Sequence, residues 1–248
     1  MFHRIETRRS FEEAVEQVSQ ALRAGDLQAG DKLPSERDLA MLMGISRPTV
    51  REAIKLLGDA GVVEVRPGKQ GGTFVVSALV PKNLLDERSD LRLAEVAGVL
   101  EARRLFEPRV AQLAALRGTD DDFEALRQTI AQQKQAADNH ELGLQLDLRF
   151  HLRIARATQN PPLVAMMRYL LKQLEIARDM ALHDELESQH AVAIHERTLE
   201  AILSGDPERV EIAMDEHMGF LERIWEQESG RSRLRRTPDF LLPYAERV

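Results

Sequence analysis

The sequence predicts a mainly α-helical protein in two parts: a small helical domain that ends in a β-hairpin, and a larger antiparallel bundle of helices. In the first part, three short stretches of helical periodicity precede two stretches typical of strands. In the second part, apolar residues recur at helical spacing and no stretch alternates like a strand. We expect a first domain over 1–76, a linker over 77–91, the bundle over 92–229 and a flexible tail over 230–248.

Three helices are predicted in the first domain. The first covers Ser10–Arg23 and begins with Ser10 followed three residues later by Glu13, the spacing of a capping box. The other two lie within Leu33–Ile54 and are joined by a tight turn at Gly44, a residue that readily adopts the left-handed conformation. We expect these two helices to bury apolar stripes, formed by Leu39, Leu42 and Met43 in one and by Val50, Ala53, Ile54 and Leu57 in the other.

Serines are predicted to cap both of these helices. Ser35 precedes the first, and Ser46 precedes the second, where Pro48 falls in the first turn and its missing N–H costs little. Downstream, Val62–Val65 and Gly72–Val76 read as two strands around a basic, glycine-rich tip. A helix, a helix-turn-helix and such a hairpin make a winged helix-turn-helix, an architecture that places its last helix in the major groove of DNA.

Arginines near the start of these helices are candidates for DNA contact. Arg47 and Arg51 are four residues apart and share one helix face, and Arg37 begins the preceding helix. Thr49 is a candidate for a backbone or base contact and Lys69 for a phosphate contact, whereas capping accounts for Ser35 and Ser46 with phosphate contact as an addition. The alternative is that the arginines form ion pairs on a solvated surface, with Glu36, Asp38 and Glu52.

The second part is predicted to contain six helices, at roughly 92–117, 120–138, 140–158, 162–183, 185–204 and 207–229. The intervening breaks contain Gly, Asn, Asp or Pro, and short connections of this kind indicate antiparallel neighbours in a bundle. Asn160, which precedes Pro161 and Pro162, is explained by helix capping. Trp225, the only tryptophan, is interpreted as a packing residue or a dimer contact.

Four polar residues occupy helix faces that are otherwise apolar: Asp147, His151, His195 and His217. Buried polar groups are costly without partners, so we expect these four to meet around a metal. Three imidazoles and a carboxylate suit zinc, with nickel, manganese or another divalent ion as alternatives. The opposing interpretation is that each histidine is a core residue bonded to a backbone carbonyl.

Arg103 also lies on a buried stripe, with Val96, Leu100, Glu107 and Val110. An arginine in such a place can bind a carboxylate ligand through its planar fork. The alternative, an ion pair with Glu107 four residues later, is equally consistent with the spacing.

Composition narrows the class of protein. The absence of cysteine excludes disulfides and thiolate metal sites, and no apolar run reaches the length of a membrane span. With no signal-peptide core, a cytoplasmic protein that does not bind membranes is expected. The net charge is −7, but residues 1–80 carry 11 basic and 11 acidic side chains, so the excess acidity lies outside the winged domain.

The motifs LPSERDLA, GISRPTVREAI and GGTFV resemble the winged helix of the GntR family of bacterial transcription regulators. By this resemblance, Arg37, Arg47 and Arg51 match arginines that contact DNA, and Gly71 matches the position at the wing tip that enters the minor groove. The stretches DLRFHLRIARATQN, IHERTLEAILSGD and AMDEHM, with Glu101–Arg103 and Glu107-Pro108, resemble the FCD ligand-binding domain of the FadR subfamily. In many members of that subfamily the residues that match Asp147, His151, His195 and His217 bind a metal, whereas His183 and His190 match none of them.

Taken together, these features predict a homodimeric transcription regulator, and more specifically a repressor. Two winged domains would read the half-sites of a pseudo-palindromic operator, and a small organic acid bound beside the metal and Arg103 would control this binding. Two other hypotheses stay open: a metal-dependent enzyme with an appended DNA-binding domain, and a regulator whose metal is purely structural.

Overall fold

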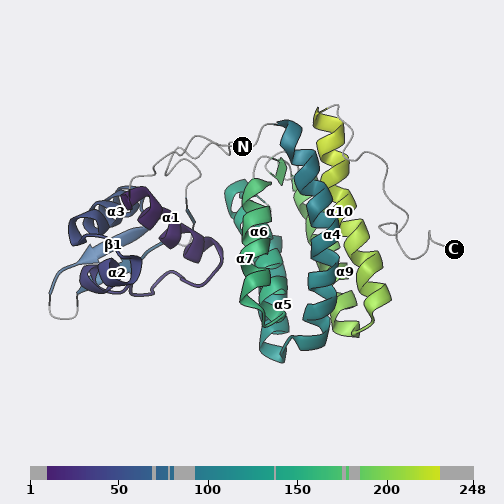
Figure 1. Cartoon of the computed structure of the whole chain (residues 1–248), viewed down its shortest axis with the longest axis horizontal. Helices are drawn as coiled ribbons and strands as arrows, with labels where there is room; N and C mark the ends of the chain where they lie inside the picture. The colour runs from purple at the N-terminus through teal and green to yellow at the C-terminus, as the bar shows by residue number, and fades with distance from the viewer. Residues whose placement is uncertain are drawn as a thin grey trace, which may run out of the picture. The chain divides into compact units, whose positions relative to one another are not determined.

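The computed structural model describes residues 10–68, 71–77, 79–80, 93–136, 138–174, 177–178 and 185–229 (Figure 1). The chain divides into two compact units, with the boundary between Arg88 and Ser89. Within the described residues, no helix is long and apolar enough to cross a membrane.

The first unit is a winged helix-turn-helix, as predicted. Its helices are α1 (Ser10–Arg23), α2 (Glu36–Met43) and α3 (Arg47–Asp59), and its strands are β1 (Val63–Arg66) and β2 (Gly72–Val75). The two strands pair antiparallel, with Val63 opposite Val75 and Arg66 opposite Gly72. Helix α1 packs on α3, and α2 contacts α3 as well.

Local chemistry fixes the helix-turn-helix. The Ser35 side chain accepts a hydrogen bond from the Asp38 N–H at the start of α2, and Ser46 does the same for the Thr49 N–H at the start of α3. Between the helices, Gly44 has φ of 66°, the left-handed conformation expected for it. The two caps and the turn therefore follow the prediction.

The predicted apolar stripe of α2 is wrong in one position, because Leu42 is 71% exposed. Leu39 and Ala40 are the buried residues of this helix, and Met43 packs partly against the core. At about 100° per residue, Leu42 points about 105° away from the centre of that face. The stripe of α3 is confirmed, since Val50, Ala53, Ile54 and Leu57 are all buried.

The second unit is a bundle of helices, among them α4 (Leu93–Arg117), α5 (Asp120–Gln135) and α6 (His140–Ala157). The others in the described part are α7 (Pro161–Gln173), α9 (Glu185–Ser204) and α10 (Pro207–Ser229). Figure 1 shows α4 and α10 side by side, and close packing also joins α5 to α6 and α9 to α10. The buried residues include Trp225, which packs against Val96, Leu100 and Leu174 as a core side chain.

The helix predicted over 162–183 is confirmed in part, and the capping role predicted for Asn160 is wrong. Helix α7 ends at Gln173 and a turn follows at Leu174; residues 177–178 are helical again, and 175–176 and 179–183 lie outside the described residues. Asn160 precedes the helix, but its side chain makes no capping hydrogen bond. Pro161 and Pro162 have no N–H to offer, and the N–H of Leu163 bonds to the Asn160 backbone oxygen instead.

Candidate functional site

The winged unit presents its candidate arginines to solvent at the N-terminal ends of α2 and α3. The side chains of Arg37, Arg47 and Arg51 are 81%, 60% and 62% exposed. Glu36 joins two of them: its carboxylate accepts from Arg51 Nη2 at 2.6 Å and Nε at 3.1 Å, and lies 4.0 Å from Arg47 Nη2. Because these ion pairs are exposed, breaking them to form contacts with phosphates or bases costs little free energy. The same arginines can therefore form surface ion pairs in the free protein and contact DNA in a complex.

The remaining candidates of this unit have local roles. The Thr49 hydroxyl is hydrogen-bonded to the Ser46 hydroxyl at 2.7 Å, and the Ser35 hydroxyl donates to the Asp38 carboxylate at 2.6 Å. Gly71 lies at the wing tip, where a Cβ would stand 2.2 Å from the Arg66 carbonyl oxygen, so only glycine fits there. Lys69 lies outside the described residues.

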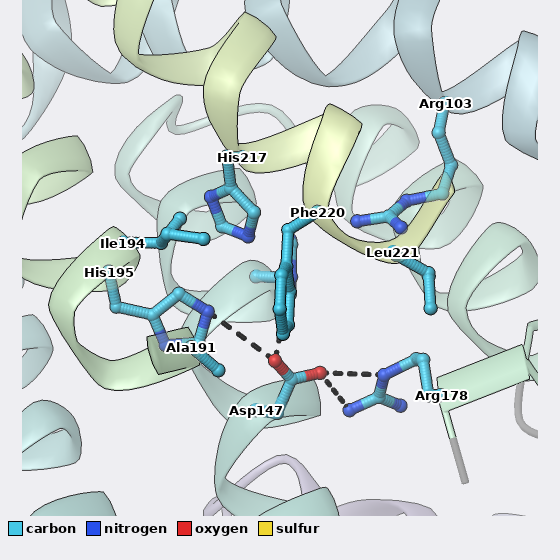
Figure 2. A pocket seen from close by; sticks show the side chains of 10 residues that line it. Arg103, Asp147, Arg178, Ala191, Ile194, His195, His217, Phe220 and Leu221 are labelled. Carbon is cyan, nitrogen blue, oxygen red and sulfur yellow. Dashed lines mark hydrogen bonds and ion pairs between the residues drawn. The ribbon is translucent and has the colours of Figure 1, made fainter. Parts of the chain in front are cut away.

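In the helical unit, three histidines from three helices converge. His151 of α6, His195 of α9 and His217 of α10 are 2%, 1% and 6% exposed, and one ring nitrogen of each lies within 4.8 Å of the others. Figure 2 shows His195 and His217 on one side of the cavity that they line. The ring of Phe150 stacks on His195 with 4.0 Å between centroids and holds it in place.

Each of these histidines has its Nδ1 engaged by a different buried side chain. The Nδ1 atoms of His151, His195 and His217 lie 2.7, 2.8 and 3.1 Å from oxygens of Glu107, Gln133 and Thr198, respectively. A carboxylate or amide oxygen can only accept, so the first two contacts place the proton on Nδ1 and leave Nε2 as the lone-pair donor. This is the arrangement that orients histidines in metal sites.

Asp147 stands beside the histidines and is held by a cation. Its Oδ1 lies 3.4 Å from His195 Nε2 and 4.0 Å from His151 Nε2, whereas Oδ2 accepts from Arg178 Nε at 2.6 Å (Figure 2). Arg178 also donates to the Leu144 carbonyl oxygen. By binding Oδ2, Arg178 thus orients the carboxylate so that Oδ1 faces the histidines.

The protonation states suit cation binding. Burial alone would raise the pKa of Asp147, but the charge of Arg178 and the contact with His195 outweigh it and hold this pKa well below its usual range. Burial lowers the pKa of His195 and lowers that of His217 well below its ordinary value. At neutral pH the Asp147 carboxylate is therefore ionised, and the lowered pKa values favour the neutral rings of His195 and His217.

Arg103 forms the ion pair that its spacing allowed and also lies in the wall of a cavity. It forms a buried ion pair with Glu107, and it also lines the cavity, toward which Figure 2 shows its guanidinium directed. The cavity contains about 370 Å³ of space without protein atoms, its open mouth included. Its lining residues are Arg103, Asp147, His151, Arg178, Ala191, Ile194, His195, His217, Phe220 and Leu221.

The donor set fits a divalent metal. One ring nitrogen of each of the three histidines lies within 4.8 Å of the others, and Asp147 Oδ1 lies near Nε2 of His195 and His151. Zinc sites use these ligand types, with metal–nitrogen bonds of about 2.0–2.1 Å. The separation of up to 4.8 Å between the histidine nitrogens exceeds the roughly 3.3 Å of a tetrahedral site, so the rings would close slightly around an ion.

Comparison with known proteins identifies both units. Residues 11–75 match the family described as bacterial regulatory proteins, gntR family, and residues 98–220 match the FCD domain. LutR of Bacillus subtilis, an HTH-type transcriptional regulator, is 32% identical over 215 residues, which cover 82% of this chain and 95% of LutR. The chain belongs to the GntR family.

Two further comparisons place the chain within that family. NanR of Escherichia coli, an HTH-type transcriptional repressor, is 29% identical over 222 residues, which cover 85% of this chain and 82% of NanR. The solved structure of E. coli McbR/YncC has a TM-score of 0.53 and 21% identity, and covers 90% of this chain and 100% of that one, which shows a shared fold. The chain is thus a GntR-type DNA-binding transcription regulator with an FCD domain, and not an enzyme.

All candidate residues lie within the two matched domains. The GntR match contains Ser35 to Gly71, and the FCD match contains Arg103 and the Asp147 and histidine cluster. The sequence reasoning missed the supporting residues Gln133, Thr198 and Arg178. Gln133 and Thr198 are polar residues on buried helix faces and could have been found by the criterion that found the histidines. Arg178 lies within the stretch predicted as helical, four residues after Leu174 and seven after Leu171, both buried, so the same criterion applies to it.

Proposed function

We propose that this regulator is a homodimeric repressor whose operator binding is controlled by a small carboxylate ligand, bound beside a divalent metal in the FCD domain. The observation that carries the proposal is the convergence of three buried histidines, each with its Nδ1 held by Glu107, Gln133 or Thr198. Orienting contacts of this kind are characteristic of metal-binding histidines. Core histidines have no need to bring one ring nitrogen each within 4.8 Å of the others.

The DNA-binding part of the proposal rests on the recognition helix. Arg47, Thr49 and Arg51 lie within its first two turns, where helix-turn-helix proteins contact base edges. Arg37 and the wing, with Lys69 and Gly71, supply contacts to phosphate and the minor groove. Two copies related by a twofold axis would read a pseudo-palindromic operator. A regulator of bacterial operator DNA acts in the cytoplasm.

The metal ligands in this proposal are Asp147, His151, His195 and His217, and the donor types favour zinc, with nickel or manganese as alternatives. A bound divalent ion would supply positive charge and open coordination positions for a carboxylate ligand. Arg103, which lines the same cavity, offers the planar fork that suits a carboxylate. The ligand is therefore a small organic acid.

Control of DNA binding requires that the ligand favour one of two dimer geometries. A ligand shifts such an equilibrium only through different affinities for the two states. We propose that the ligand-bound dimer holds its recognition helices at a spacing that no longer fits the half-sites. The repressor assignment draws support from the relative NanR, which is an HTH-type transcriptional repressor.

Elemental analysis tests the metal site directly. The wild type and His195→Ala are purified without added metal or chelator, and His190→Ala is the control because His190 is an exposed histidine outside the cluster. We expect close to one divalent ion per chain in the wild type and the control, and a loss in His195→Ala. No metal in the wild type would contradict the metal site.

Ligand control is tested on DNA. A duplex is first selected in vitro from random sequences by the purified protein, and its affinity is then measured by fluorescence anisotropy with a panel of small carboxylates. At least one acid that binds the FCD domain is expected to lower the affinity for the duplex. The second candidate, a structural metal without ligand control, predicts that metal removal lowers stability while no bound acid changes DNA affinity.

A further inference from the structure

Glu107 lies between the arginine that lines the cavity and one of the three histidines. Its Oε1 accepts a hydrogen bond from Arg103 Nε, and its Oε2 lies 2.7 Å from His151 Nδ1. The Glu107 side chain is fully buried, and the side chains of Arg103 and His151 are 3% and 2% exposed. Glu107 and Arg103 belong to α4, whereas His151 belongs to α6.

The Glu107 carboxylate is ionised, and its charge is shared between these two partners. Burial would raise its pKa, but the charge of Arg103, with the hydrogen bonds from His151 and Arg103, outweighs burial and keeps this pKa well below its usual range. In a buried site, where screening by water is weak, a change at one partner alters the interaction with the other. Asp147, which lines the cavity, is held by Arg178 instead.

We propose that Glu107 is a positioning residue that couples the binding of an acid at Arg103 to the affinity of the histidines for metal. A carboxylate ligand on Arg103 draws that guanidinium away from Glu107 and leaves more of the Glu107 charge on His151. A stronger anionic partner at Nδ1 makes Nε2 of His151 a better metal ligand. Metal and acid then strengthen each other, because coupling between two binding events is reciprocal. This inference rests on the proposed function.

A second buried pair in the same bundle provides the matched control. Arg104, next to Arg103 on α4, donates from Nε to Glu222 of α10 at 3.0 Å. Glu222 and Glu107 are each 1% exposed, so removing either charge disturbs a comparable buried arginine–glutamate pair. Both oxygens of Glu222 accept from Arg104, whereas one oxygen of Glu107 is bonded to His151.

The first test measures zinc affinity in the full-length, chelator-stripped protein by competition with a chromogenic chelator. Glu107→Gln is expected to bind zinc about 10–100-fold more weakly than the wild type. Glu222→Gln is expected to stay within about twofold. Circular dichroism and Trp225 fluorescence verify folding. A folded Glu107→Gln variant with wild-type zinc affinity would overturn the inference.

A second variant, Arg103→Met, is expected to change zinc affinity in the opposite direction, and its test does not depend on whether Glu107→Gln folds. Arg103→Met removes the competing cation, so the Glu107 charge is left to His151 and zinc affinity is expected to rise several-fold. A general disturbance of the core would lower that affinity instead. An unchanged or lower zinc affinity in Arg103→Met would therefore refute the proposal that Glu107 shares its charge between Arg103 and His151.

Acetate serves as the probe for coupling. Zinc affinity is compared in sodium acetate and in sodium chloride of equal ionic strength, with correction for zinc acetate formed in solution. Acetate is expected to raise zinc affinity in the wild type and to have a smaller effect in Glu107→Gln, whereas equal effects in both would refute the coupling. If the wild type binds no zinc, the proposed metal site itself fails; if it binds zinc and Glu107→Gln binds it equally well, only the role of Glu107 fails.

Discussion

Replacing Arg178 with methionine removes the cation that neutralises Asp147 and keeps much of the side-chain volume. The side chains of Arg178 and Asp147 are 6% and 10% exposed, so solvent cannot take over the role of the arginine. Breaking a buried ion pair from one side costs about 3–5 kcal/mol, because a buried charge is left without compensation. The variant also loses the hydrogen bond to the Leu144 carbonyl oxygen. We expect its metal-free form to be destabilised by about 3–5 kcal/mol.

Trp225 makes this loss measurable in the helical unit alone, since it is the only tryptophan of the chain and lies in the core of that unit. At about 2–4 °C per kcal/mol, the midpoint of thermal unfolding followed by Trp225 fluorescence should fall by about 6–20 °C in chelator. Added zinc should narrow the gap to the wild type, because the ion supplies positive charge beside Asp147.

A double variant, Arg178→Met with Asp147→Asn, separates the ion pair from general packing. It removes both charges, and replacement of a whole buried pair is often close to neutral, so it should be more stable in chelator than Arg178→Met alone. The reasoning is refuted if Arg178→Met unfolds at the wild-type temperature in chelator. It is also refuted if the double variant is no more stable than the single one.

Three further predictions concern other parts of the chain. Arg51→Ala should weaken binding to the selected duplex by about 1–3 kcal/mol in an anisotropy titration, whereas Arg197→Ala, which removes an exposed arginine paired with Glu216 outside the winged domain, should leave it unchanged. Leu57→Ala, at a fully buried position of the winged core, should destabilise that unit by about 2–5 kcal/mol in circular dichroism without moving the Trp225 transition; a shift of both transitions together would contradict independent units. Metal-free protein should lose stability toward urea as the pH falls below about 6.5, because burial lowers the pKa of His217, so the unfolded chain takes up protons that the folded chain does not; a His217→Phe variant with the same pH slope would contradict this.

The positions that sequence reasoning placed well are those governed by short-range rules. Ser35, Ser46 and Gly44 act within one or two turns of the chain, and their roles follow from capping and from left-handed glycine geometry. The inward direction of His151, His195 and His217 followed from helical periodicity, because a polar residue on an apolar stripe shares the direction of its neighbours.

The errors occur where the result depends on long-range packing. Leu42 fits an apolar stripe by spacing, but α2 is short and the core covers only the face that carries Leu39 and Ala40. Leu174, just after α7, is buried in one core cluster with Trp225, a residue about 50 positions away in the chain. Periodicity within one helix contains no information about such partners.

The sequence by itself therefore determined the class of fold, the family and the set of polar residues that face inward, because these depend on local spacing and on motifs read along the chain. Only the tertiary structure decided which atoms of those residues meet. It assigned Glu107, Gln133 and Thr198 to the three histidines and Arg178 to Asp147, through contacts between side chains 19 to 62 positions apart. Spacing fixes the direction of a side chain, but the partner that it reaches depends on how separate helices pack.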